Sequence, residues 1–274
     1  NDIFSYGGKL NMQTDMTVGK PMKMLLNFTI PVFLGNVFQQ LYSMADAVIV
    51  GKFVGTKGLA AVGATGTITF LIIGFLMGVT TGVTVLTSQK FGAGRMDEMR
   101  KTVGNAAILS AVIAVVMTAV SMLGMHRLLV FMHTPEDIFD GAYGYIMIIC
   151  AGIFTQVLYN LVSSIFRALG NSKTPLYFLI LAAGLNIVLD LVFIIFFHWG
   201  APGAAWATVI SQGVSGVLCL IYMWKAVPEL KMKKEDWYFN RDIAVKQISV
   251  GIPMGLQYSI TAIGGMMVQS SLNI

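Results

Sequence analysis

The chain has 274 residues, of which 56% are hydrophobic and only 11% are charged. Soluble globular domains carry about 25% charged residues, so this composition excludes an ordinary soluble domain. The formal net charge of +5 could suit a nucleic-acid partner. The basic residues gather in alternate connectors between apolar blocks, however, so no nucleic acid is expected.

Seven apolar blocks follow one another, separated by polar connectors. Each is long enough to cross a hydrocarbon core of roughly 30 Å as a helix, which takes about 20 residues. None has the alternating pattern of a membrane β-barrel strand. The sequence therefore predicts an all-α, polytopic helical bundle in a lipid bilayer, with blocks at 24–50, 59–87, 102–125, 138–169, 175–197, 204–227 and 243–274.

The 18 Lys and Arg residues indicate how the chain is oriented. All but three of them lie in the N-terminal segment or in the connectors after the second, fourth and sixth blocks. By the positive-inside rule these segments are cytoplasmic, and so is the N-terminus.

A short repeat suggests how the chain is divided. The stretches "NFTIPVFLG" and "SVGIPMGLQ" open the first and seventh blocks, and an even number of spans between them would give both the same orientation. We therefore expect a cytoplasmic N-terminal segment (1–23), a six-helix lobe (24–227), a cytoplasmic linker (228–242) and the first helix of a second lobe (243–274). The rest of the second lobe is expected to be missing from the sequence.

Only two of the 13 acidic residues lie away from the connectors and their edges, Asp46 and Asp190. A charge at bilayer depth costs about 2.5–3.5 kcal/mol on insertion scales, so such residues usually face a protein interior. Asn186 lies four residues before Asp190, on the same helical face. The carboxylate oxygens of Asp190 and the amide oxygen of Asn186 could together bind Na⁺ or exchange a proton. The alternatives are an interfacial acid at Asp46 and a structural polar contact between helices at Asp190.

Other polar residues could join this cluster, although most side chains of this kind form hydrogen bonds between helices. They are Gln39, Gln40, Tyr42, Gln156, Tyr159, Asn160, Thr208 and Gln212. Pro31 lies on the same helix as Asp46 and removes a backbone hydrogen bond, which predicts a kink. That kink could be a switch that responds to the ion, or a static packing feature.

Five stretches resemble the multidrug and toxic compound extrusion (MATE) transporters: "IPVFLGNVFQQLYSMADAVIVG", "SQKFGAGR", "FRALGNSKTP", "LNIVLDLVFI" and "GAPGAAWATVISQ". The likeness runs through residues 20–274 in the family's order. It implies a twelve-helix transporter of two six-helix lobes in the inner membrane of a bacterium. It also implies an antiporter that exports organic cations, drugs or metabolites in exchange for H⁺ or Na⁺, with no cofactor beyond that ion.

The resemblance also implies roles for particular residues. The family's N-terminal cation site maps to Asp46, Asn186, Asp190 and Thr208, and its kinking proline maps to Pro31. If the ion is Na⁺, the resemblance places it at Asp46, Asn186 and Asp190.

Other function classes fit the sequence less well than an antiporter. A flippase for lipid-linked precursors should have a basic cavity for pyrophosphate, but here the buried charges are acidic. An intramembrane aspartyl protease could use Asp46 and Asp190 as a dyad, but neither acid stands in that family's motif. The stretch "FGAGR" lacks the Gly-Lys-Ser/Thr ending of a P-loop, so the energy source is expected to be an ion gradient. The protein is not expected to be an enzyme. An uncoupled channel remains open.

Overall fold

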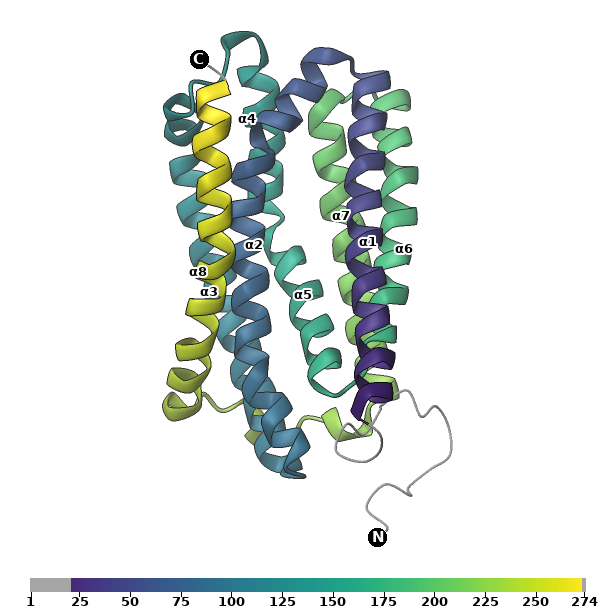
Figure 1. Ribbon diagram of the computed structural model, residues 1–274, viewed down its shortest axis with the longest axis vertical. Helices are drawn as coiled ribbons and strands as arrows, with labels where there is room; N and C mark the ends of the chain where they lie inside the picture. The colour runs from purple at the N-terminus through teal and green to yellow at the C-terminus, as the bar shows by residue number, and fades with distance from the viewer. Residues whose placement is uncertain (1–20, 273–274) are drawn as a thin grey trace.

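The computed structural model describes residues 21–272, and within that range every regular element is a helix (Figure 1). In chain order the elements are α1 (Pro21–Phe53), α2 (Thr56–Gly92), α3 (Met96–Phe131), α4 (Glu136–Ala151), α5 (Ile153–Ala168), α6 (Lys173–Leu191), the π-helix η1 (Val192–Phe196), α7 (Gly200–Ala226), the 3₁₀-helices η2 (Pro228–Leu230) and η3 (Lys234–Trp237), and α8 (Arg241–Leu272). The predicted all-α bundle is confirmed, and most helices extend a few residues beyond the apolar blocks because their ends lie in polar surroundings.

The predicted fourth helix is wrong in one respect, because block 138–169 forms two helices. Helices α4 and α5 meet at Gly152 with a bend of 49°. A Cβ added at Gly152 would lie 2.2 Å from Cγ2 of Val209, so α7 approaches the backbone closely at this point. The backbone at Gly152 has φ −82° and ψ 3°, which most residues can adopt, so the glycine is required by the close contact with α7.

Within the described part of the chain, five helices are long and apolar enough to cross a membrane, and the bent pair α4–α5 makes a sixth if it counts as one span. The predicted seventh span corresponds to α8, a helix of 32 residues that is not among these candidates. Its first two turns carry Arg241, Asp242, Lys246 and Gln247, which lowers its mean hydropathy. Figure 1 shows α8 running alongside α2.

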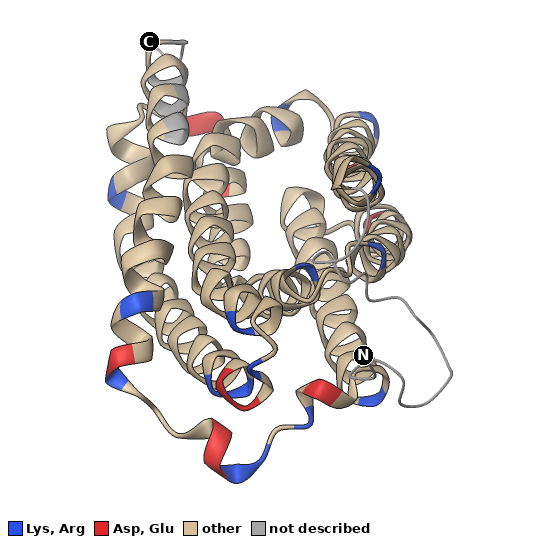
Figure 2. Ribbon diagram, turned by 60° about the horizontal axis from the view of Figure 1, so that its bottom comes forward, with Lys and Arg blue, Asp and Glu red and all other residues tan. Residues whose placement is uncertain are grey.

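Two apolar clusters form the core of the bundle. One joins α2, α3, α4 and α7 around residues such as Ile68, Leu129 and Ile146. The other joins α2, α3, α5 and α7 around Met99 and Phe166, near the end of the bundle where η2 lies. Charged residues lie mostly at helix ends and on the connecting segments (Figure 2). This distribution is that of a membrane bundle with polar ends.

Helix α1 lies at the edge of the bundle, beside α6 and α7 (Figure 1). It buries only Pro31, Asp46, Ile49 and Val50, although it is 33 residues long. Helix α1 packs mainly against α6, and two of its four buried residues are ones that the sequence singled out.

Candidate cation site

Three helices bring the predicted site residues together. Asp46 comes from α1, Asn186 and Asp190 from α6, and Thr208 from α7, and all four are buried. Asn186 and Asp190 lie one turn apart on the buried side of α6, as their spacing predicts. Asp190 also lies two residues before the start of the π-helix η1, an element that occurs frequently at functional sites.

Thr208 joins the helices through its hydroxyl group. Its Oγ1 accepts hydrogen bonds from the Tyr42 hydroxyl at 3.1 Å and from Asn186 Nδ2 at 3.4 Å. Because Asn186 directs its amide nitrogen toward Thr208, its Oδ1 is left available on the other side. The hydrogen of the Thr208 hydroxyl group can then be donated to a further acceptor.

The remaining oxygens of the site are buried acceptors that lack donors. Asp46 Oδ1, Asn186 Oδ1 and both carboxylate oxygens of Asp190 have no hydrogen-bond partner in the described structure. The Asp46 and Asp190 carboxyl groups lie close enough to interact electrostatically. Two carboxylates in contact repel each other unless a proton or a cation lies between them. This arrangement can therefore bind a proton or a small hard cation.

Two tyrosines flank the carboxyl groups, and the sequence analysis found only one of them. Tyr42 lies one turn before Asp46 on α1 and was expected near the cluster. Tyr145 of α4 is 6% exposed and lies close enough to interact electrostatically with both aspartates. A mid-span tyrosine is common in membrane helices, so no sequence signal distinguished Tyr145 from the others.

Pro31 is buried on α1, and the helix continues through it without interruption. Pro31 and Asp46 are separated by about four turns of the same helix. Pro31 removes one backbone hydrogen bond from α1 at this position.

The other predicted polar residues differ in their burial and in their hydrogen-bond partners. Tyr159 donates its hydroxyl to the Pro175 carbonyl at 3.1 Å and so joins α5 to α6. Asn160 donates to the Gln156 carbonyl within α5 at 2.9 Å, and Gln212 on α7 is buried with its Oε1 unpartnered. On α1, Gln39 is half-buried and Gln40 is exposed.

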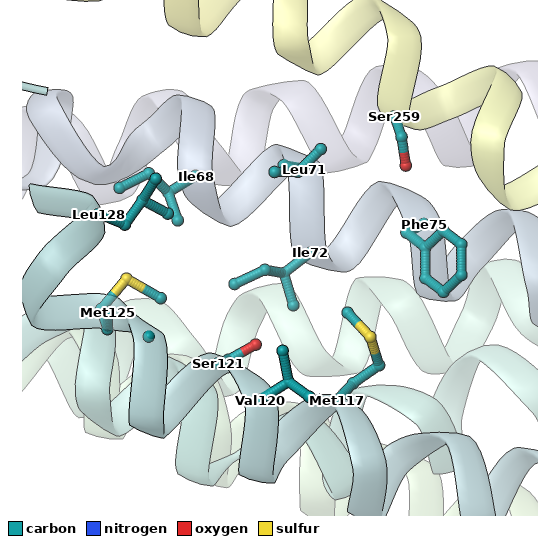
Figure 3. Close-up of a pocket in the computed structure, with 11 residues that line it drawn as sticks. Ile68, Leu71, Ile72, Phe75, Met117, Val120, Ser121, Met125, Leu128 and Ser259 are labelled. Carbon is teal, nitrogen blue, oxygen red and sulfur yellow. The ribbon is translucent and has the colours of Figure 1, made fainter. Parts of the chain in front are cut away.

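A separate apolar pocket of about 470 Å³ lies between α2, α3 and α8 (Figure 3). Hydrophobic side chains such as Ile72, Phe75 and Met117 line it, and its hydroxyl groups come from Ser121 and Ser259. None of the predicted site residues lines this pocket. The chemistry of the aspartate cluster therefore lies elsewhere in the bundle.

Comparison with known proteins places the chain in a family. The MatE family model matches residues 31–192, which include Pro31, Asp46, Asn186 and Asp190. The probable multidrug resistance protein YpnP of Bacillus subtilis (strain 168) is 32% identical over 261 residues, which cover 94% of this chain and 58% of the relative.

Two solved structures have the same fold as the described helices. One is described as the outward-facing conformation of a multidrug resistance MATE family transporter of the MOP superfamily. It has a TM-score of 0.80 and 28% identity and covers 88% of this chain and 53% of that chain. The other is described as an inward-facing conformation of such a transporter. It has a TM-score of 0.77 and 27% identity and covers 85% of this chain and 53% of that chain. The chain therefore spans about half the length of the proteins it matches, and it belongs to the MatE family of transporters.

Proposed function

We propose that this chain is part of a secondary active antiporter that exports organic cations in exchange for H⁺ or Na⁺. The coupling ion would bind among Asp46, Asn186, Asp190 and Thr208. The observation that carries this proposal is the group of buried, unpartnered oxygens on Asp46 of α1 and on Asn186 and Asp190 of α6, beside the Thr208 hydroxyl of α7. Buried acceptors without donors are costly, and a bound proton or cation would remove that cost.

The coupling would act through α1. Ion binding neutralises the repulsion between the two carboxyl groups and draws α1 toward α6 and α7. Helix α1 carries Asp46 and packs mainly against α6, which carries Asn186 and Asp190, so binding of the ion would change the contact between these two helices. Pro31 would provide the point at which α1 bends when its position changes. The ion must bind one conformation more tightly than the other, typically by 1–3 kcal/mol, for its gradient to drive export.

The proposal extends to topology and location. We place the transporter in the plasma membrane of a bacterium with its N-terminus cytoplasmic, because 15 of the 18 basic residues lie in the N-terminal segment or in connectors on that side. Residues 24–227 would form the six-helix lobe, 228–242 the linker between lobes, and 243–274 the first helix of the second lobe. Family membership favours this function over a lipid-precursor flippase or an intramembrane protease.

The test uses the full-length transporter in proteoliposomes loaded with a fluorescent organic cation. A pH gradient or a Na⁺ gradient is imposed separately, and export is followed by fluorescence. We expect one of the two gradients to drive export above the rate of protein-free vesicles. Export that is equally fast without any gradient would indicate an uncoupled channel instead.

Thr208 offers a second test, because its hydroxyl orients both Tyr42 and Asn186. The Thr208→Val substitution keeps the shape of the side chain but removes the acceptor of two hydrogen bonds. Each neutral hydrogen bond contributes about 0.5–1.5 kcal/mol, so we expect apparent ion affinity to fall roughly tenfold. Affinity is measured as the ion concentration that gives half-maximal export. Thr208→Ser retains the hydroxyl and should restore most of the affinity; if Thr208→Val behaves as wild type, this orienting role is wrong.

A further inference from the structure

The segment between α7 and α8 is attached to the end of α3. Asn105 on α3 is fully buried, and its Oδ1 accepts a hydrogen bond from the Asn240 backbone N–H at 2.9 Å. Its Nδ2 donates to the Tyr238 carbonyl at 3.4 Å and to the Lys101 carbonyl at 3.0 Å. One side chain therefore holds the backbone of the linker against α3.

An ion pair and a close backbone contact lie beside Asn105. Arg100 Nε lies 3.5 Å from Asp236 Oδ2, and Arg100 Nη1 donates to the Glu229 carbonyl at 3.4 Å. Asp236 is 4% exposed, so this pair is largely removed from water. A Cβ added at Gly104 would lie 2.1 Å from the Asp236 carbonyl oxygen. The linker thus rests directly on the backbone of α3.

Gln247 continues the attachment into α8. It is fully buried, and its Nε2 donates to the Val83 carbonyl on α2 at 3.0 Å and to the Thr102 carbonyl on α3 at 2.8 Å. A single amide therefore connects three helices. The sequence analysis gave Gln247 no role, because a glutamine near the start of a span is common.

Glycines allow α8 to approach α2 closely just beyond Gln247. A Cβ at Gly82 would lie 2.4 Å from Gly251 Cα, and one at Gly78 would lie 2.6 Å from Gly255 Cα. Gly78 and Gly82 are four residues apart on α2, and so are Gly251 and Gly255 on α8. This spacing lets membrane helices pack backbone to backbone. The contact between α2 and α8 is therefore tight at the end of the bundle where the linker lies.

We propose that Asn105 and Gln247, with the Arg100–Asp236 pair, form a latch that closes this end of the transporter and must open during each transport cycle. We call this set the linker latch. The inference rests on the proposed antiporter function, since alternating access requires the second lobe to move relative to the first. The linker itself is attached to α3 through hydrogen bonds and an ion pair, which suits a contact that is broken and remade.

The first test fixes the latch with a reversible cross-link. Lys101→Cys and Tyr238→Cys are introduced into the full-length transporter, in a background whose other cysteines are replaced. Both positions are exposed, and their carbonyls bind the same Asn105 amide, so a short bis-methanethiosulfonate reagent should join them. We expect export to stop in the cross-linked protein and to recover when dithiothreitol cleaves the link. Each single-cysteine variant is the control and should keep its export rate.

Export at the wild-type rate from fully cross-linked protein would overturn the proposal, because the linker would then stay attached throughout the cycle. A second measurement does not depend on transport. The substitution Val83→Cys places a cysteine where the side chain packs against Gly251. This cysteine is labelled with a membrane-impermeant maleimide added on the linker side. Gln247→Leu removes two hydrogen bonds and should raise the labelling rate roughly tenfold.

Ser249→Ala is the matched control on α8, since the Ser249 hydroxyl is exposed and bonds only within its own helix. It should leave the labelling rate unchanged. Equal labelling of wild type and Gln247→Leu would also overturn the latch. Absence of export from the wild type would instead contradict the antiporter function, while cross-linking and labelling would still report on the latch.

Discussion

Replacing Asp190 with Asn should abolish gradient-driven export by the full-length transporter. The amide has nearly the same shape as the carboxyl group, but it can neither release a proton nor balance the charge of Na⁺. Ion coupling of this kind is typically worth a factor of 5–150 in affinity, so we expect export to fall by about that factor or to background. Asp46→Asn should have the same effect, because both carboxyl groups face the same ion.

The stability of these variants separates a functional role from a structural one. Both carboxylate oxygens of Asp190 are buried and unpartnered, so the charged residue costs free energy in the folded state when no ion is bound. Asp190→Asn should therefore keep or raise the midpoint of thermal unfolding measured without the coupling ion. A structural polar contact would show the opposite, a lower midpoint.

Asp140→Asn is the matched control, since Asp140 is an exposed acid on α4. It should leave both export and stability unchanged. The proposed coupling is wrong if Asp46→Asn and Asp190→Asn both export at the wild-type rate under the gradient that drives the wild type.

The helical architecture could be predicted from the sequence because hydrophobic blocks report directly on the surrounding solvent. A span must satisfy its backbone hydrogen bonds internally, so a long apolar block in lipid has little choice but to form a helix. The same reasoning cannot find the break at Gly152. That break depends on the approach of Val209, which is more than fifty residues away in the chain and becomes a neighbour only when α7 packs.

The aspartate cluster could be predicted in part. The spacing of Asn186 and Asp190 places them on one face of a helix, and the cost of buried charge singles out Asp46 and Asp190 among the acids. Which helices meet at these residues is a tertiary property, so the residues alone left Thr208 as one polar side chain among several. The resemblance to a known family supplied that position, and the structure brings Thr208 within hydrogen-bonding distance of Asn186.

The linker shows where sequence reasoning ends. Residues 228–242 are polar and charged, which is typical of a solvated connector, and nothing in that composition indicates an attachment to α3. The contacts with Asn105 are made mainly by backbone groups of the linker, which carry no side-chain signal. Backbone contacts of this kind become visible only once the helices are placed.

Gly152→Ala replaces a single hydrogen with a methyl group, yet it should destabilise the bundle strongly. The new Cβ would lie 2.2 Å from Cγ2 and 2.8 Å from Cγ1 of Val209. Valine has one strongly preferred rotamer in a helix, so it cannot easily turn both methyl groups away. Overpacking of this kind costs about 1–3 kcal/mol, which should appear as a lower midpoint of thermal unfolding in detergent.

The compensating change identifies the cause. Val209→Ala removes both methyl groups. The double variant Gly152→Ala/Val209→Ala should therefore be more stable than Gly152→Ala alone. Such a non-additive result is expected only of residues in contact. Gly184→Ala on α6 is the control, since no atom lies within 4 Å of its added Cβ, and alanine there should be neutral or stabilising. If the double variant is no more stable than Gly152→Ala, steric contact with Val209 does not explain the break between α4 and α5. If it is more stable, the bend is set by the packing of α7, and the sequence of α4 and α5 alone could not have specified it.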